Sequence, residues 1–222
     1  MGSDNIIISI GGFLGGIVSR SAGRNGSLKD SGTRKAESRP VGRFSSVKSL
    51  IPGDVNIRYG DEDGIVVEAD ENIVPLLKTE VIDDVLTIST TGSFSTQQPL
   101  KVSVTIQNDR EMPDLDLVGS GDIAMHGVDQ AELAVSLHGS GDIVVSGRAK
   151  RVSLSLVGSG DIDARCLKGE EADIRLMGSG DVEASASEKV SVTLMGSGDV
   201  VVVGAPKKVN SSNLGSGDVS IR

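Results

Sequence analysis

The chain has 222 residues, of which 29 are glycine and only four, three Phe and one Tyr, are aromatic. Few rings argue against a thick globular core, while plentiful Val, Ile and Leu exclude disorder throughout and favour many short strands. The net charge is -9, and residues 1–50 carry eight Lys or Arg against three Asp or Glu, so the remainder carries -14. An acidic body of this size disfavours nucleic acid as a partner.

The first 40 residues contain an apolar run followed by a polar stretch. The run, residues 6–18, is too short to cross a bilayer as a helix, and no Lys or Arg precedes it as a secretory signal requires. Its four glycines favour two short strands, NIIISI and GGIVSRS. Residues 19–40 have the composition of a linker. We therefore assign residues 1–40 to an N-terminal segment, partly disordered or in short strands, and residues 41–222 to one domain.

Alternating apolar residues begin after residue 41 and continue to the end of the chain. The segments GIVVEAD, VLTIST and LKVSVTI alternate with a period of two, which is typical of strands with one buried face. IPGDVNIRYG, residues 51–60, resembles a degenerate copy of the GSGD repeat that follows. These early units are less regular than the later ones.

The tetrapeptide GSGD occurs six times, at residues 119–122, 139–142, 158–161, 178–181, 196–199 and 215–218, with starts 18 to 20 residues apart. Each of the first five copies precedes a short alternating strand, a polar or Gly-containing turn such as HGVDQ or SGRAK, and a second strand. A unit of about 19 residues cannot bury its own apolar side, but stacked copies can. The sequence therefore predicts an all-β protein, a β-solenoid (β-helix) with GSGD corners.

The last unit departs from the pattern in its second strand. Val209 is followed by Ser211 and Asn213, where earlier units have aliphatic residues. A polar terminal repeat is the expected cap of a solenoid, because an open apolar end invites pairing with another chain.

The segment RPVGRFSSVKSLIPGDVNIRYGDEDGIVVEADENIVPLLKTEVIDDVLTIST, followed by serial GSGDI or GSGDV, resembles the GIN domain, the head domain of bacterial auto-transporter adhesins. The resemblance covers about residues 39–222. It rests on the Arg-x-Val-x-x-Phe start, the EADENIVP segment and the GSGD array together. It implies a β-solenoid exported to the cell envelope or outside the cell, and it supplies no catalytic residues.

Stacking would place the Asp of every GSGD copy in one column. Such carboxylates, about 5 Å apart, repel one another and invite a cation such as Ca²⁺. The alternative is that each Asp accepts backbone N–H bonds within its own turn. The candidate calcium ligands are Asp122, Asp142, Asp161, Asp181, Asp199 and Asp218.

The sequence gives less support to phosphate binding, glycoside hydrolysis, zinc binding and thiol catalysis. No GSGD copy is followed by the Lys of a phosphate-binding loop, and six equivalent Asp residues lack the asymmetry of a glycosidase pair. We expect His138 to be a half-buried corner residue, and His126 and Cys166 to lie on turns. Neither His has a nearby Cys for zinc, and Cys166, the only cysteine, excludes an intramolecular disulfide and has no evident His partner.

The sequence therefore predicts a non-catalytic envelope or surface module, without a cofactor, that binds a glycan or a protein. Homo-oligomers are compatible with it, and no transmembrane segment is expected. Two other functions stay open: a Ca²⁺-stabilised solenoid module, and a carbohydrate-active enzyme on a β-helix.

Overall fold

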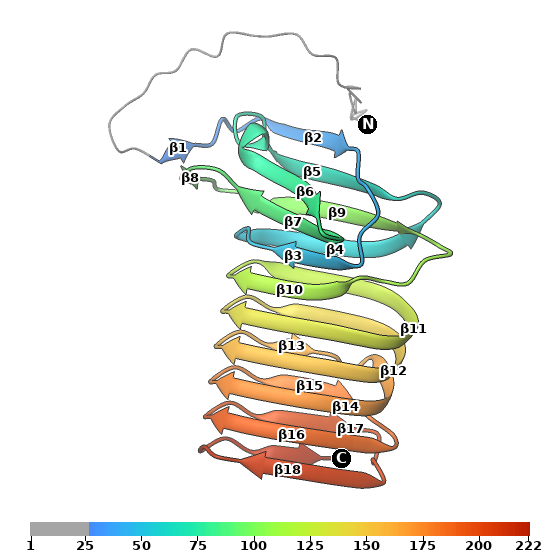
Figure 1. Cartoon of the computed structure of the whole chain (residues 1–222). Coiled ribbons are helices and arrows are strands. Elements are labelled where there is room, and N and C mark those ends of the chain that lie inside the picture. The colour runs from blue at the N-terminus through green and yellow to red at the C-terminus, as the bar shows by residue number, and fades with distance from the viewer. Residues whose placement is uncertain (1–26) are drawn as a thin grey trace, which may run out of the picture.

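The computed structural model describes residues 27–222, which consist almost entirely of strands (Figure 1). The N-terminal elements are β1 (Leu28–Lys29), β2 (Arg34–Arg39), β3 (Ser46–Ser49), β4 (Gly53–Gly60), β5 (Gly64–Asp70), the 3-10 turn η1 (Val74–Leu76), β6 (Leu77–Ile82), β7 (Val85–Thr90), β8 (Phe94–Ser95) and β9 (Leu100–Gln107). The elements of the repeat region are β10 (Asp114–Gly119), β11 (Asp122–Gly139), β12 (Ile143–Gly158), β13 (Ile162–Asp163), β14 (Leu167–Gly178), β15 (Val182–Ser185), β16 (Lys189–Gly196), β17 (Val200–Val203), β18 (Lys208–Asn213) and β19 (Val219–Ile221). The strand pair predicted between residues 5 and 21 lies outside the described residues.

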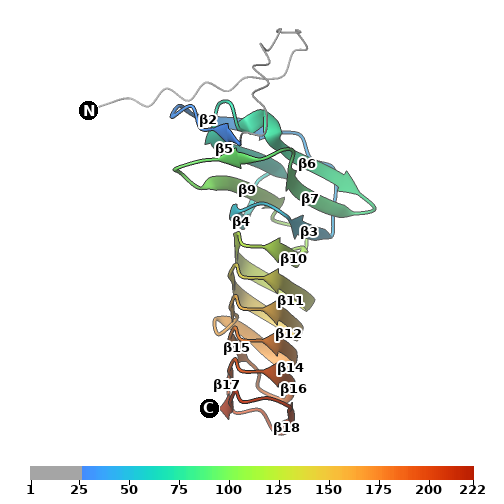
Figure 2. The same ribbon diagram turned by 90° about the vertical axis from the view of Figure 1, so that its left-hand side faces the viewer.

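The repeat region is a column of stacked coils (Figures 1 and 2). Strand segments that precede the GSGD corners form one parallel stack, and segments that follow them form a second. Equivalent residues of successive coils pair in register: Leu137 with Leu156, and Leu156 with Leu176. The predicted β-solenoid with GSGD corners is therefore confirmed.

Aliphatic side chains fill the narrow interior between the two stacks. The inward positions predicted for both strands of the coils between Ile123 and Val202 are all buried, and Leu154 and Leu156 are 0% exposed. Full burial of such a side chain is worth about 1.5–3 kcal/mol. Ladders of Val, Ile and Leu thus provide the core that the scarce aromatic residues cannot.

The turns predicted after the first strand of each coil are present in only some coils. Later coils do break there, with turn residues at Arg165 and Cys166. In β11 and β12, however, the strand runs on through HGVDQ and SGRAK, with a bulge between His126 and Val128. The prediction of turns there was wrong, because the two segments pair with each other and SGRAK also pairs with β14, so hydrogen bonds to parallel neighbours keep the bent backbone in the ladder.

The coil made by β3 and β4 is out of sequence order in the stack. β3 lies between β7 and β10, and β4 between β9 and β11. Asp54 pairs with Asp122 and Val55 with Ile123, so IPGD is indeed a corner of the same column. The chain after β9 therefore crosses this earlier coil to begin β10.

An antiparallel sheet covers the N-terminal end of the column. β2 pairs with β5, β5 with β9, and β6 with β7, all antiparallel. Arg39 donates to the carbonyl oxygens of Leu77 at 2.7 Å and Val74 at 3.0 Å, while Phe44 is buried in the core. The side chain of Asn72 bonds Lys29 and Ser31. Residues of the Arg-x-Val-x-x-Phe and EADENIVP motifs thus hold this cap together.

The C-terminal end is closed by polar groups. Every residue of β18 is exposed, including Val209. Asn213 accepts a bond from the N–H of Gly215 at 3.0 Å and donates to the carbonyl of Gly217 at 2.7 Å. The predicted polar cap is therefore present, and its side chain satisfies backbone groups of the last corner.

The two glycines of each corner have different tasks. In every GSGD corner except the last, the first has positive φ, for example 142° at Gly158, in the region that favours glycine. The second is buried against the preceding coil: a Cβ on Gly160 would collide with the carbonyl group of Gly141. Only glycine at this position allows the coils to approach to strand-pairing distance.

Candidate functional site: the Asp column and the ladder face

The six Asp residues of the corners form a hydrogen-bonded column. The N–H of Asp142 donates to Oδ1 of Asp122 at 3.0 Å, and that of Asp161 to Oδ1 of Asp142 at 3.1 Å. The same bond, at 2.8 Å, joins Asp181, Asp199 and Asp218 each to the Asp of the preceding coil. All the carboxylates except that of Asp218 thus accept a bond from the next coil, whereas the sequence had suggested a bond within their own turn.

In each carboxylate that accepts such a bond, the acceptor is the Oδ1 atom alone. Residues 27–222 contain no group of three or more His, Cys, Asp or Glu side chains placed to share a metal ion. The six Asp residues are all exposed and have equivalent surroundings. No difference in environment therefore sets one carboxylate apart as a general acid and another as a general base.

A second feature, which we call the ladder face, is the outer surface of β10, of the second parts of β11 and β12, and of β14, β16 and β18. In Figure 1 no other described segment lies over these strands. Because the strands are parallel and in register, its side chains form four rows along the solenoid axis. Row 1 is Glu132, Arg151, Glu171, Lys189 and Lys208; row 2 is Asp114, Ala134, Ser153, Asp173, Ser191 and Asn210; row 3 is Asp116, Ser136, Ser155, Arg175, Thr193 and Ser212; row 4 is Val118, His138, Val157, Met177, Met195 and Leu214.

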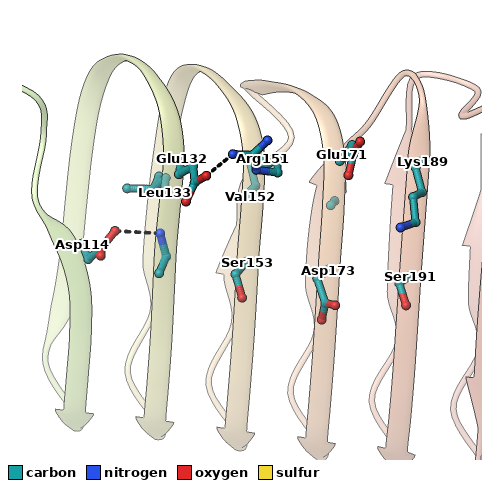
Figure 3. Close-up of a pocket in the computed structure, with 12 residues that line it drawn as sticks. Asp114, Glu132, Leu133, Arg151, Val152, Ser153, Glu171, Asp173, Lys189 and Ser191 are labelled. Atoms are coloured by element: carbon teal, nitrogen blue, oxygen red, sulfur yellow. Dashed lines mark hydrogen bonds and ion pairs between the residues drawn. The ribbon is translucent and has the colours of Figure 1, made fainter.

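Rows 1 and 2 line a shallow cavity of about 380 Å³ whose lining residues come from five successive coils (Figure 3). Charges alternate along row 1 from Glu132 to Lys189, and Glu132 pairs with Arg151. The hydrogen bond from Arg151 to Glu132 raises the pKa of the guanidinium, so Arg151 keeps its positive charge over the physiological range. Asp114 accepts the backbone N–H of Ala134 at 2.8 Å at the start of row 2.

Row 4 is an exposed apolar stripe beside the corners. Val157, Met177 and Met195 are each more than a third exposed, and Leu214 is 70% exposed. Solvent-facing apolar residues in successive coils are unusual for a monomer surface, where such residues are normally scattered. The alternation of residues along each strand identifies these outward positions in the sequence. That they align into one stripe follows only from the parallel register of the strands.

The remaining residues singled out in the sequence do not come together. His126 lies in β11 and not on a turn, and its Nδ1 is 2.8 Å from the Ser146 hydroxyl. His138 is exposed in row 4, not half-buried as predicted. Cys166 is exposed on a turn, as predicted. No His–Cys pair joins them among residues 27–222, where metal-ligating clusters are also absent.

Sequence reasoning missed an ion cluster on the opposite face. Arg165 donates from Nε at 3.1 Å and from Nη2 at 2.7 Å to the carboxylate of Asp163, and its Nε also pairs with Glu183. The hydrogen bonds from Arg165 lower the pKa of Asp163, against a smaller opposing effect of burial. These charges lie on adjacent coils, and only the register between β13 and β15 reveals that they meet.

The fold and the site together define a parallel β-solenoid domain with an antiparallel N-terminal cap and a polar C-terminal end. The sequence family described as "Putative auto-transporter adhesin, head GIN domain" matches residues 43–206. The chain belongs to this family, which confirms the resemblance noted in the sequence. No curated protein shows a significant match.

Several solved bacterial structures share the fold. A putative adhesin from Bacteroides fragilis NCTC 9343 superposes with a TM-score of 0.74 at 20% identity, over 88% of this chain and 100% of that one. A putative adhesin and a putative lipid binding protein from Parabacteroides distasonis ATCC 8503 give TM-scores of 0.58 and 0.57 at 22% and 19% identity, each over 89% of this chain and 100% of theirs. At these identities the likeness establishes the fold alone.

Proposed function

We propose that this chain is a non-catalytic, adhesin-like binding module of the bacterial envelope or cell surface, and that the ladder face contacts its ligand. The observation that supports this most directly is the face itself. It presents four regular rows of charged, hydroxyl-bearing and apolar side chains on strands that no other described segment covers. A rigid, repetitive surface of this kind is typical of the binding faces of solenoid proteins.

The repetition also argues against catalysis. An enzyme needs a singular arrangement in which neighbouring groups differ in environment, whereas the corners of this column repeat the same Gly, Ser and Asp. Membership of the adhesin family supports the same reading and the surface location. Among residues 27–222 no helix has the length and hydropathy needed to span a bilayer.

The shape of the face suits an extended ligand, either a glycan or a protein segment. The cavity of rows 1 and 2 follows the solenoid axis over five coils and is lined by Ser153, Asp173 and Ser191 as well as by charges of row 1. Hydroxyl, carboxylate and cationic groups at a regular spacing of about 4.8 Å can contact successive units of a linear polymer.

A binding screen with two matched variants tests this proposal. Immobilised glycans and bacterial or host surface proteins are probed with the wild-type chain, with Ser153→Tyr in the cavity and with Val144→Tyr on the opposite face of the same coil. We expect at least one ligand whose signal falls about tenfold or more, that is by about 1.4 kcal/mol of binding free energy, with Ser153→Tyr and persists with Val144→Tyr. Equal binding by all three proteins, or glycan cleavage products, would overturn it.

A further inference from the structure

We propose that a second copy of this chain is a partner of the ladder face, so that two molecules associate face to face. This inference rests on the proposed function, because it names the partner of that same surface. The two copies are related by a two-fold axis that runs parallel to the strands and passes between the coils of Arg151 and Glu171. Their strands are then aligned, as in packed β-sheets, and their solenoid axes point in opposite directions.

Row 1 supplies the charge complementarity that selects this arrangement. The axis sets Glu132 of one copy opposite Lys189 of the other, and Arg151 opposite Glu171, each twice by symmetry. A shift of the axis by half a coil would set Arg151 against Arg151 or Glu171 against Glu171. Like charges in contact cost several kcal/mol at an interface, so row 1 excludes these half-coil shifts. A shift by a whole coil sets either Asp114 opposite Asp173 or Arg151 opposite Lys208, and is excluded for the same reason.

The other rows accept this register without a like-charge contact. Row 2 places Asp173 opposite Ser153, and row 3 places Arg175 opposite Ser155. Row 4 meets row 4, so that Met177 of one copy covers Val157 of the other, and both exposed side chains leave water. The remaining pairs are Asp114 with Asn210, Ala134 with Ser191, Asp116 with Ser212, Ser136 with Thr193, Val118 with Leu214, and His138 with Met195.

The alternative two-fold arrangement, with the solenoid axes parallel, is unfavourable. An axis along the solenoid would place row 1 of one copy on row 4 of the other, and Glu171 would then face Met177. Charges would lose water against apolar side chains without a counter-charge, which costs several kcal/mol. Only the arrangement with opposite solenoid axes places row 1 of one copy against row 1 of the other, and row 4 against row 4.

The dimensions of the face indicate a weak association. Five coil spacings of about 4.8 Å give about 24 Å along the axis, and six residues at about 3.3 Å give about 20 Å across it. The two copies together bury about 1,000 Å², the lower limit for a specific interface. Such a contact is transient between single molecules and becomes strong when many copies face one another, as on two cell surfaces.

Charge exchange between copies tests the proposal. Glu132→Lys alone places Lys opposite Lys189 of the partner, and Lys189→Glu alone places Glu opposite Glu132. Mixed together, the two variants form a heterodimer in which both contacts are again between opposite charges. A disturbance within one chain, such as loss of the Glu132–Arg151 pair, would not be repaired by mixing.

Association is measured by sedimentation equilibrium at low salt, from about 1 μM to 1 mM, with circular dichroism to show that each variant is folded. We expect a concentration-dependent wild-type dimer, at least tenfold weaker association of each variant alone, and recovery to within about threefold in the mixture. Glu170→Lys and Lys168→Glu, exposed residues outside the four rows, serve as matched controls and should behave as wild type.

Three results would overturn this inference: a wild-type chain that stays monomeric, variants that dimerise as well as wild type, or a mixture no tighter than its components. Its failure is separable from that of the proposed function. If the chain stays monomeric but the binding screen finds a ligand lost with Ser153→Tyr, only the self-association is wrong. If neither association nor a ligand is found, both proposals fail.

Discussion

The backbone N–H of Asp181 donates a 2.8 Å hydrogen bond to the Oδ1 atom of Asp161, one coil earlier in the solenoid. The relationship recurs between every pair of neighbouring GSGD corners, so every Asp side chain of the column except that of Asp218 joins two coils. The Asp column is therefore a side-chain ladder that continues the backbone ladder around the corner, where the strand hydrogen bonds change direction.

Two replacements of Asp161 should distinguish what its hydrogen bond contributes to the free energy of unfolding from what its charge contributes. We expect Asp161→Ala to lower the free energy of unfolding by about 1–2 kcal/mol, because the N–H of Asp181 loses its acceptor. Asp161→Asn keeps an acceptor and removes repulsion between stacked carboxylates, so it should stay within about 0.5 kcal/mol of wild type. Urea unfolding measures both, and a larger loss for Asn than for Ala would contradict the ladder.

The same column tests the calcium hypothesis. If the carboxylates only accept backbone N–H bonds, neither a chelator nor about 1 mM Ca²⁺ should move the melting temperature. A bound ion would raise it in proportion to the logarithm of the ion concentration above its dissociation constant. Differential scanning calorimetry with Ca²⁺, and with Mg²⁺ as the ionic-strength control, decides the question. A rise with Ca²⁺ that disappears in Asp161→Asn would establish a calcium site.

The second glycine of a corner should tolerate no side chain. In Gly160→Ala the new Cβ meets the carbonyl group of Gly141, which belongs to rigid backbone. We expect a loss of about 3 kcal/mol or more, the upper end of the cost of overpacking, because two coils must separate. Gly64→Ala in β5 is the control, since its Cβ has open space around it. Similar urea midpoints for the two variants would show that the corners are not closely stacked.

Asp163 should make part of the stability depend on acid pH. Its folded pKa lies below the unfolded value, so its contribution is complete above the unfolded pKa near 3.8 and is lost as the pH falls through the folded value. The difference in unfolding free energy between wild type and Asp163→Asn should therefore shrink as the pH is lowered from about 5 to about 2. A constant difference across this range, measured by urea unfolding, would contradict the depressed pKa.

Much of the fold follows from short-range patterns in the sequence. Alternation identified the buried positions, such as Leu154 and Leu156, and the spacing of GSGD identified the coil. The insertion of β3 between β7 and β10, and of β4 between β9 and β11, could not be predicted, because it depends on which strands pair and not on any local signal. The continuous strands through HGVDQ and SGRAK were missed for a related reason: hydrogen bonds to the neighbouring coils outweigh the local preference of Gly for turns.

The candidate site was predictable only in its residue types. The sequence placed the Asp residues in one column, but each was expected to serve its own turn. Whether Asp161 bonds its own turn or the next coil depends on the exact offset between coils, which the sequence does not encode locally. The four rows of the ladder face require the same offset, since Glu132 and Arg151 are neighbours only when the coils are in register.

The polar end of the solenoid should prevent end-to-end growth. Asn213 occupies the position that Leu194 has in the preceding coil, and it bonds the backbone of Gly215 and Gly217. Asn213→Leu should remove these bonds, at a cost of about 1–2 kcal/mol, and leave an apolar terminal coil with an unpaired edge. We expect oligomers that grow with concentration in light scattering, whereas Ser220→Leu, on the outer side of the same coil, should not form them. If Asn213→Leu has the same oligomeric state as wild type at every concentration, the polar residue is not what protects this end.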